Sequence, residues 1–382
     1  MAGRKRHLFA LLAAGVAVFL LPIPAAAAPT VTTVTSGLDS PRGIAFFHGK
    51  LMVGEAGHGG SDCFSPPGAP PDVQLCIGAT SRVSRVNSNG THTPFVSGLF
   101  SVVTPEGEAL GVSGLSASDD RLLVQIGLTP REVPSSNTLG QKQAGQLISI
   151  RPNGTWKAIA PVGAFDFDYT TTLPAPQEHD SNPYGVLASG DGAYVADAGS
   201  NTLDWVNEHG KIKIVAYDPF RTNPPTFPTD SVPTCVVRTE DGLLVGELAG
   251  RLLKVHGSTF TTIDLKDSAG NSLLSHVTGC TTDRQGNVYL VNMFGPGPVF
   301  TPPPASKFFI GNVVKYNPES GKASMLIDGL RLPNMDTVGP DGNLYVTIGA
   351  VCGPTPGPAG SPCAGLTGGV IKIVLPRNEE ND

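Results

Sequence analysis

The chain has 382 residues, and 15% of them are charged, which excludes a coiled coil or a protein built from long helices. Its 47 glycines and 35 prolines indicate many turns, while 40% hydrophobic residues are enough to bury a core. The formal net charge of −6 argues against nucleic acid or an anionic membrane as a partner.

Residues 1–28 have the composition of an export signal. A basic segment at residues 4–6 precedes an apolar run from Leu8 to Ile23, and the alanines at 25–28 are suitable for cleavage by a signal peptidase. The alternative is a retained N-terminal anchor. We predict cleavage near Ala27 or Ala28, and hence a secreted, extracytoplasmic protein without a membrane span.

The rest of the chain, 29–382, contains a repeated pattern of two short apolar segments separated by a turn with Gly or Asp. An anchor residue in each first segment lies 12 positions before the end of the second segment. The six anchor pairs are Gly43 and Glu55, Gly114 and Ile126, Gly185 and Asp197, Cys235 and Glu247, Cys280 and Asn292, and Asp336 and Ile348.

A second hairpin follows most copies, as in SRVSRV–NSNG–THTPFV, so each repeat is predicted to form four antiparallel strands. Four-stranded repeats of about 45 residues are typical of propeller blades. The sequence therefore predicts an all-β fold, a single six-bladed propeller domain. The last repeat lacks its outer strand, and Val31–Ser36 is predicted to supply it and so to close the ring. A pair of β-sandwiches would not explain six equal spacings.

The segments TSGLDSPRGIAF, GKLMVGEAGHGG and VADAGSNTLDWVN resemble exported NHL-type propellers of the ScyD/ScyE family, and the resemblance spans the chain after residue 28. It implies a propeller in an extracytoplasmic location. It implies no settled reaction and no catalytic residues, because the NHL repeat marks a scaffold with many functions.

Long loops are expected at one end of the propeller, where second strands end and the next blades begin. We call this end the loop face and the opposite end the turn face. Varied loops on a rigid scaffold are where binding sites usually lie. The loops are Ala56–Thr80, Gly127–Ala144, Val162–Asn182, Met293–Ile310 and Gly349–Gly368.

Six cysteines in an exported protein favour disulfides over metal ligation. Cys63–Cys76 and Cys352–Cys363 would each close one loop of the loop face. Cys235 and Cys280 take the same anchor position in neighbouring repeats, so they either form a third disulfide or pack as two small buried thiols.

Four polar residues end the second strands of their repeats: Glu55, Asp197, Glu247 and Asn292. Hard oxygen ligands around a channel mouth could hold Ca²⁺. Alternatively, these side chains cap turns or bond backbone amides of the adjacent blade, and Ile126 and Ile348 interrupt the ring.

His58, His179 and His276 map to the loop face, where a histidine beside a carboxylate could act as a general base. His179 and Asp180 are the catalytic candidates, unless they are simply solvated. Tyr184, His276 and Asp336 are candidate ligand contacts. Loop aromatics could form an apolar floor for a ligand or pack beneath the loops: Tyr169, Tyr184, Phe294, Phe300, Phe308 and Phe309.

These observations predict a monomeric exported propeller that binds a small molecule or a protein on its loop face, without catalysis. The alternative function is a Ca²⁺-dependent hydrolase or lactonase that uses the carboxylate ring.

Overall fold

The computed structural model describes residues 29–66, 70, 73–175, 177–219, 230–296 and 309–376. The predicted export signal at residues 1–28 lies outside this part of the chain. Across the described ranges, no helix is both long and apolar enough to cross a membrane.

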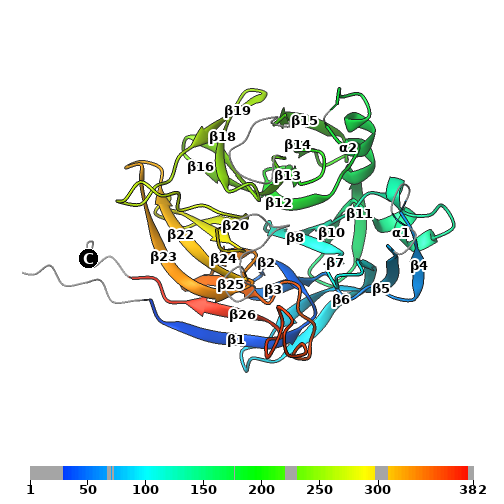
Figure 1. The fold of residues 1–382 in the computed structure, drawn as a ribbon, viewed down its shortest axis with the longest axis horizontal. Helices are drawn as coiled ribbons and strands as arrows, with labels where there is room; N and C mark the ends of the chain where they lie inside the picture. The colour runs from blue at the N-terminus through cyan, green and yellow to red at the C-terminus, as the bar shows by residue number, and fades with distance from the viewer. Residues whose placement is uncertain are drawn as a thin grey trace, which may run out of the picture.

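Six antiparallel sheets are arranged around a central axis as the blades of a propeller, which confirms the predicted fold (Figure 1). In blades 1 to 5 the main strands run from the axis outward in chain order. Blade 1 contains β2 (Pro41–Phe47), β3 (Lys50–Glu55), β5 (Leu75–Val86) and β6 (His92–Val103), with the short β4 (Asp62–Phe64) and β7 (Ala109–Leu110) at its edges. Blade 2 contains β8 (Val112–Ala117), β9 (Leu122–Ile126), β10 (Gln146–Ile150) and β11 (Trp156–Pro161).

Blade 3 contains β12 (Pro183–Ser189), β13 (Gly192–Asp197), β14 (Thr202–Val206) and β15 (Ile212–Tyr217). Blade 4 contains β16 (Pro233–Thr239), β17 (Gly242–Glu247), β18 (Arg251–His256) and β19 (Thr259–Ile263). Blade 5 contains β20 (Val277–Thr282), β21 (Val288–Asn292), β22 (Ile310–Asn317) and β23 (Lys322–Arg331). Among the described residues, three short helices lie in the loops between strands: η1 (Pro130–Glu132), α1 (Thr138–Gln143) and α2 (Val162–Thr170).

Blade 6 combines both ends of the described chain. It contains β24 (Asp336–Val338), β25 (Leu344–Ile348), β26 (Gly368–Ile373) and, as its outermost strand, β1 (Val31–Leu38). β1 runs antiparallel to β26, from the pair Val31–Ile373 to the pair Leu38–Gly368, and the two lie side by side in Figure 1. The ring is thereby joined by backbone hydrogen bonds between segments more than 300 residues apart.

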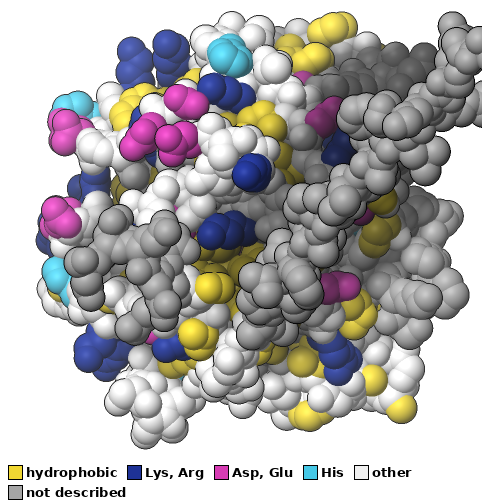
Figure 2. All heavy atoms as spheres, turned by 90° about the vertical axis from the view of Figure 1, so that its left-hand side faces the viewer, with side chains coloured by type: hydrophobic (Ala, Val, Ile, Leu, Met, Phe, Trp, Pro, Cys, Tyr) yellow, Lys and Arg dark blue, Asp and Glu magenta, His cyan; other side chains and the backbone are white. Residues whose placement is uncertain are grey.

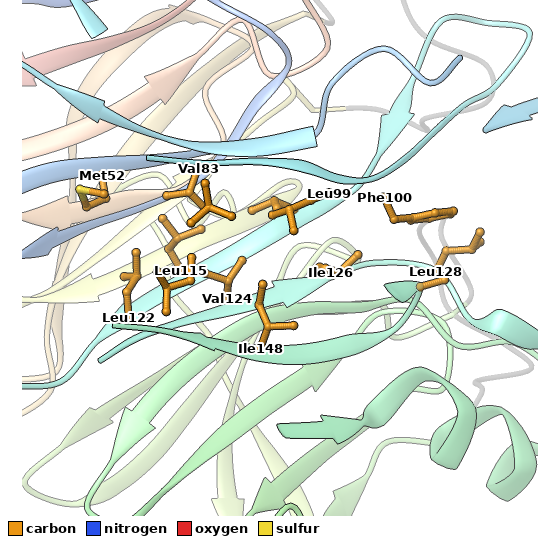
Figure 3. Close-up of a cluster of buried hydrophobic side chains, with 14 of the residues drawn as sticks. Met52, Val83, Leu99, Phe100, Leu115, Leu122, Val124, Ile126, Leu128 and Ile148 are labelled. Atoms are coloured by element: carbon orange, nitrogen blue, oxygen red, sulfur yellow. The ribbon is translucent and has the colours of Figure 1, made fainter. Parts of the chain in front are cut away.

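Apolar side chains fill the spaces between blades. Figure 3 shows the largest cluster, where strands of blade 1 face strands of blade 2 through Met52, Val83, Leu115, Val124 and Ile148. Lys and Arg are interspersed with Asp and Glu on the side of the molecule seen in Figure 2.

Glycine is required where the innermost strands approach one another. A Cβ atom at Gly114 would lie 2.5 Å from the carbonyl oxygen of Tyr184, and one at Gly185 would lie 2.4 Å from that of Thr234. Side chains are therefore excluded at these anchor positions, because such contacts are far inside van der Waals distance.

Three disulfides are present, Cys63–Cys76, Cys235–Cys280 and Cys352–Cys363. The two predicted loop disulfides are confirmed, and of the two alternatives for Cys235 and Cys280 the structure has the disulfide. The predicted equivalence of Cys235 and Cys280 was wrong by one residue. Cys235 pairs with Gly246, next to the end of its second strand, whereas Gly279 and not Cys280 holds that register in blade 5. The turn between β20 and β21 is longer than the two-residue turn of blade 4, which shifts the spacing.

Candidate functional site

The four polar residues at the ends of the second strands are fully buried, and each bonds the start of its own blade. The partner is always the residue two positions before the innermost strand. Glu55 accepts from the Asp39 amide (2.7 Å), Asp197 from the Ser181 hydroxyl (2.6 Å), Glu247 from the Ser231 hydroxyl, and Asn292 from the Ser275 amide (3.0 Å). We call this repeated contact the blade lock.

Further partners take up the remaining oxygens of the blade lock. Arg82 donates to Glu55 at 2.8 and 2.6 Å, and Arg251 lies 2.5 Å from Glu247. Asp197 also accepts from the amides of Asn182, Gly199 and Ser200 at 2.8–3.0 Å. These side chains hold the first and second strands of a blade together at the loop face.

In the described part of the chain, no group of three or more His, Cys, Asp or Glu side chains is arranged to hold a metal ion. Cation binding by the carboxylate ring stays one of the two alternatives that follow from the sequence.

Adding Ca²⁺ to the EDTA-treated protein is expected to leave its Tm unchanged, because a cation would have to displace Arg82 from Glu55 and Arg251 from Glu247. Differential scanning fluorimetry measures this. A stabilisation of about 2.7 kcal/mol at a hundredfold excess over Kd, lost in Glu247→Gln, would instead establish a Ca²⁺ site.

A hydrogen-bonded bar closes the loop-face end of the channel between three blades. The Arg42 guanidinium donates to the Tyr184 hydroxyl at 3.1 Å, and that hydroxyl donates to Asn334 Oδ1 at 2.9 Å. Arg42 also forms an ion pair with Glu108 at 3.1 Å and donates to the Ala109 carbonyl. Burial acts to lower the pKa of Arg42, but Tyr184 and Glu108 raise it above the usual value, so the bar carries a fixed positive charge.

Two donors of this bar have no acceptor among the described residues, namely Arg42 Nε and Asn334 Nδ2, although both are buried. Buried donors without acceptors are unfavourable by about 1–3 kcal/mol each. The bar therefore has unused capacity for a group that accepts hydrogen bonds.

On the other side of the bar, the channel opens toward the turn face as a cavity of about 290 Å³. It is lined by the later residues of the innermost strands, including Ile44, Leu115, Val236 and Thr281. Asp336 belongs to the same wall, but its carboxylate oxygens are buried and have no hydrogen-bond partner in the described structure. Burial raises the pKa of Asp336 well above its usual value, because a carboxylate without hydrogen-bond donors is poorly stabilised there.

The structure separates the other predicted site residues. His276 is buried at the start of β20 with its ring edge-on to Phe294 at 5.7 Å, and burial lowers its pKa. His179 is exposed, and no hydrogen bond joins it to Asp180 in the part of the chain described. Burial raises the pKa of Asp180 to about 6.

Most of the described loop aromatics pack beneath the loops. Phe294 and Phe309 lie 6.1 Å apart against the apolar cluster that contains Cys352, and Tyr169 contacts Tyr217 edge-on at 6.0 Å. Phe300 and Phe308 lie outside the described residues.

Sequence reasoning missed the partner of His58. Its Nδ1 lies 2.6 Å from Oδ2 of Asp39, a buried carboxylate on the loop face. Comparing the repeats could have found it, because Asp39 stands where blades 3, 4 and 5 have serine: Ser181, Ser231 and Ser275.

A second missed feature is a set of buried acids between α2 and blade 3. Asp166, Asp197 and Asp204 are fully buried, and Thr202 donates to Asp204 at 3.0 Å and to Asp166 at 3.4 Å. Burial and the carboxylates of Asp204 and Asp197 raise the pKa of Asp166 well above its usual value. Burial and Asp197 raise the pKa of Asp204 to about 7, although the hydrogen bond from Asp166 acts to lower it.

No model of a protein family matches the chain, and no curated protein matches it in sequence. Many solved structures share its fold. A protein of unknown function from Bacteroides thetaiotaomicron has a TM-score of 0.54 at 11% identity, covering 91% of this chain and 76% of its own. A luciferin-regenerating enzyme has a TM-score of 0.50 at 11% identity, covering 91% and 95%. A putative gluconolactonase has a TM-score of 0.49 at 12% identity, covering 92% of both chains.

The two matches with TM-scores of 0.54 and 0.50 support a common fold. They transfer no activity to this chain, since propellers carry many unrelated functions. The three disulfides are typical of an extracytoplasmic protein.

Proposed function

We propose that the protein is an exported, ScyD/ScyE-like propeller that binds a small molecule on its loop face, at the bar formed by Arg42, Tyr184 and Asn334. The ligand would carry a carboxylate or a similar group that accepts hydrogen bonds. The observation that carries this proposal is a pair of buried donors without acceptors. One is Nε of the buried Arg42 guanidinium, and the other is Nδ2 of Asn334.

Glu108 is the group that such a ligand would replace. Its side chain is 51% exposed, whereas that of Arg42 is 5% exposed, so the ion pair joins a buried cation to a solvated anion. A half-exposed carboxylate contributes little to stability and can be exchanged. A ligand carboxylate could take its place on Arg42, where planar bidentate recognition of such groups is favourable.

The carboxylate ring gives the hydrolase alternative less support, because its carboxylates already accept hydrogen bonds or pair with arginines at the blade locks. Export itself rests on the composition of residues 1–28 and on the disulfides.

Replacing Glu108 by glutamine is expected to make the protein more responsive to small carboxylates, because the competing side chain loses its charge. Thermal unfolding would be followed with acetate, succinate or benzoate against chloride at equal ionic strength. We expect a rise in Tm with at least one carboxylate that is larger for Glu108→Gln than for the wild type.

Glu106→Gln is the matched control, since Glu106 is an exposed acid in the same loop. It should behave as the wild type does. Equal responses of the two variants, or no response beyond that to chloride, would overturn the proposed site.

A further inference from the structure

The start of blade 1 departs from the repeat in a way that folding does not require. In blades 3 and 4 the residue two positions before the innermost strand is a serine whose hydroxyl donates to the acid of the blade lock. In blade 1 that residue is Asp39, and the backbone amide of Asp39 makes the lock to Glu55 at 2.7 Å. The carboxylate of Asp39 is therefore not needed for the lock.

This carboxylate is nevertheless buried, with its side chain 3% exposed. Oδ2 contacts His58 Nδ1 at 2.6 Å, while Oδ1 has no hydrogen-bond partner among the described residues. A buried carboxylate with one unsatisfied oxygen is unfavourable. Its presence at this position, in contact with His58, points to a role through His58.

His58 is held firmly at its backbone and exposed at its ring. Its amide donates to Thr80 Oγ1 at 3.1 Å, and the preceding Gly57, at φ 82°, donates its amide to the Asp39 carbonyl at 3.3 Å. A Cβ at Gly57 would lie 2.6 Å from Thr80 Oγ1, so the turn that places His58 requires glycine. The side chain of His58 is 68% exposed.

The contact with Asp39 determines which ring nitrogen is available. A carboxylate accepts hydrogen bonds, so Nδ1 of His58 carries the proton and Nε2 keeps its lone pair. An imidazole held in one tautomer by a buried carboxylate is the arrangement that general-base catalysis uses.

We propose that His58 is a general base on the loop face, with Asp39 as its positioning residue, and that its substrates are acyl esters cleaved by water. Nε2 takes a proton from water as the water oxygen bonds to the carbonyl carbon, and the carbonyl π pair moves to its oxygen. The electron pair on the carbonyl oxygen then re-forms the carbonyl double bond, and the bond between the carbonyl carbon and the alcohol oxygen breaks. The proton on Nε2 passes to the alcohol oxygen. One ester and one water give one acid and one alcohol.

The test is hydrolysis of 4-nitrophenyl acetate by the purified, exported chain. We expect His58→Gln to lower kcat/KM by about a hundredfold or more, as is usual for removal of a general base. Asp39→Asn should lower kcat at nearly unchanged KM. The substitution keeps the backbone lock to Glu55, but an amide does not hold His58 in the single tautomer protonated at Nδ1.

His209→Gln is the control. His209 is an exposed histidine whose Nε2 lies 3.5 Å from the exposed Glu208, so it tests whether any surface imidazole suffices. It should leave kcat/KM unchanged. Equal rates for the wild type and His58→Gln, or an equal loss in His209→Gln, would overturn the proposal.

Nitrogen NMR of the imidazole tests the geometry independently of turnover. We expect the tautomer protonated at Nδ1 in the wild type and a mixture of tautomers in Asp39→Asn. Predominance of the tautomer protonated at Nε2 in the wild type would exclude the positioning role of Asp39. Neither experiment measures binding at the Arg42 site, so their failure would leave the binding proposal standing.

Discussion

Replacing Asp197 by alanine is expected to lower the free energy of unfolding by about 3–5 kcal/mol. The carboxylate accepts from the Ser181 hydroxyl and from the amides of Asn182, Gly199 and Ser200, all within 3.0 Å. Alanine would leave these donors without an acceptor at a site that is fully buried. Thermal and urea unfolding of the two proteins measure the difference.

Asp191→Ala provides the control, because Asp191 is an exposed acid in the turn before the same strand. It should change stability by no more than about 0.5 kcal/mol. If Asp197→Ala were as stable as this control, the blade lock would have no energetic role.

The stability of the protein is expected to fall as the pH rises from about 5 to 8. An acid whose pKa is raised by folding binds a proton in the folded state that the unfolded chain has already released, so the free energy of unfolding decreases with pH in that interval. The pKa of Asp204 is raised from 3.8 to about 7 by burial, and that of Glu132 from 4.5 to about 8. One pKa unit corresponds to about 1.4 kcal/mol, so we expect a decrease on the order of a few kcal/mol over this interval.

Asp166→Asn should flatten this dependence. In its neutral form Asp166 donates to Asp204, which lowers the pKa of Asp204, and an asparagine amide can donate in the same way without ionising. We therefore expect the variant to be more stable than the wild type at pH 8 and similar at pH 5. A residual slope from Glu132 should remain.

Asp168→Asn is the matched control on α2, because Asp168 is 58% exposed and pairs with Arg131 at the surface. Its pH profile should follow that of the wild type. An unchanged slope in Asp166→Asn would show that the Asp166–Asp204 pair does not control the pH dependence.

Local sequence signals were sufficient for the fold. The alternation of apolar residues, the Gly and Asp turns and the spacing of 12 residues identified six blades, because a blade is built from neighbouring strands joined by short turns. The disulfides Cys63–Cys76 and Cys352–Cys363 were predictable for the same reason, since each closes one loop. The register of Cys280 was not predictable from the spacing, because the longer turn between β20 and β21 shifted it by one residue.

The candidate site was predictable only in part. Tyr184 was identified from the sequence, but Arg42 and Asn334 were not, because these three residues lie up to 292 positions apart and meet only when the ring closes. His58 was recognised as a loop histidine, whereas the role of Asp39 depends on whether its side chain or its amide makes the blade lock.

The sequence by itself determined the architecture, the loop face and the residue types available there. Tertiary structure alone decided what these residues do. Glu55, Asp197 and Glu247 form the blade locks, whereas the carboxylate of Asp39 contacts His58. The physical reason is that strand formation depends on neighbours along the chain. The role of a buried polar side chain instead depends on which donors and acceptors reach it across the fold.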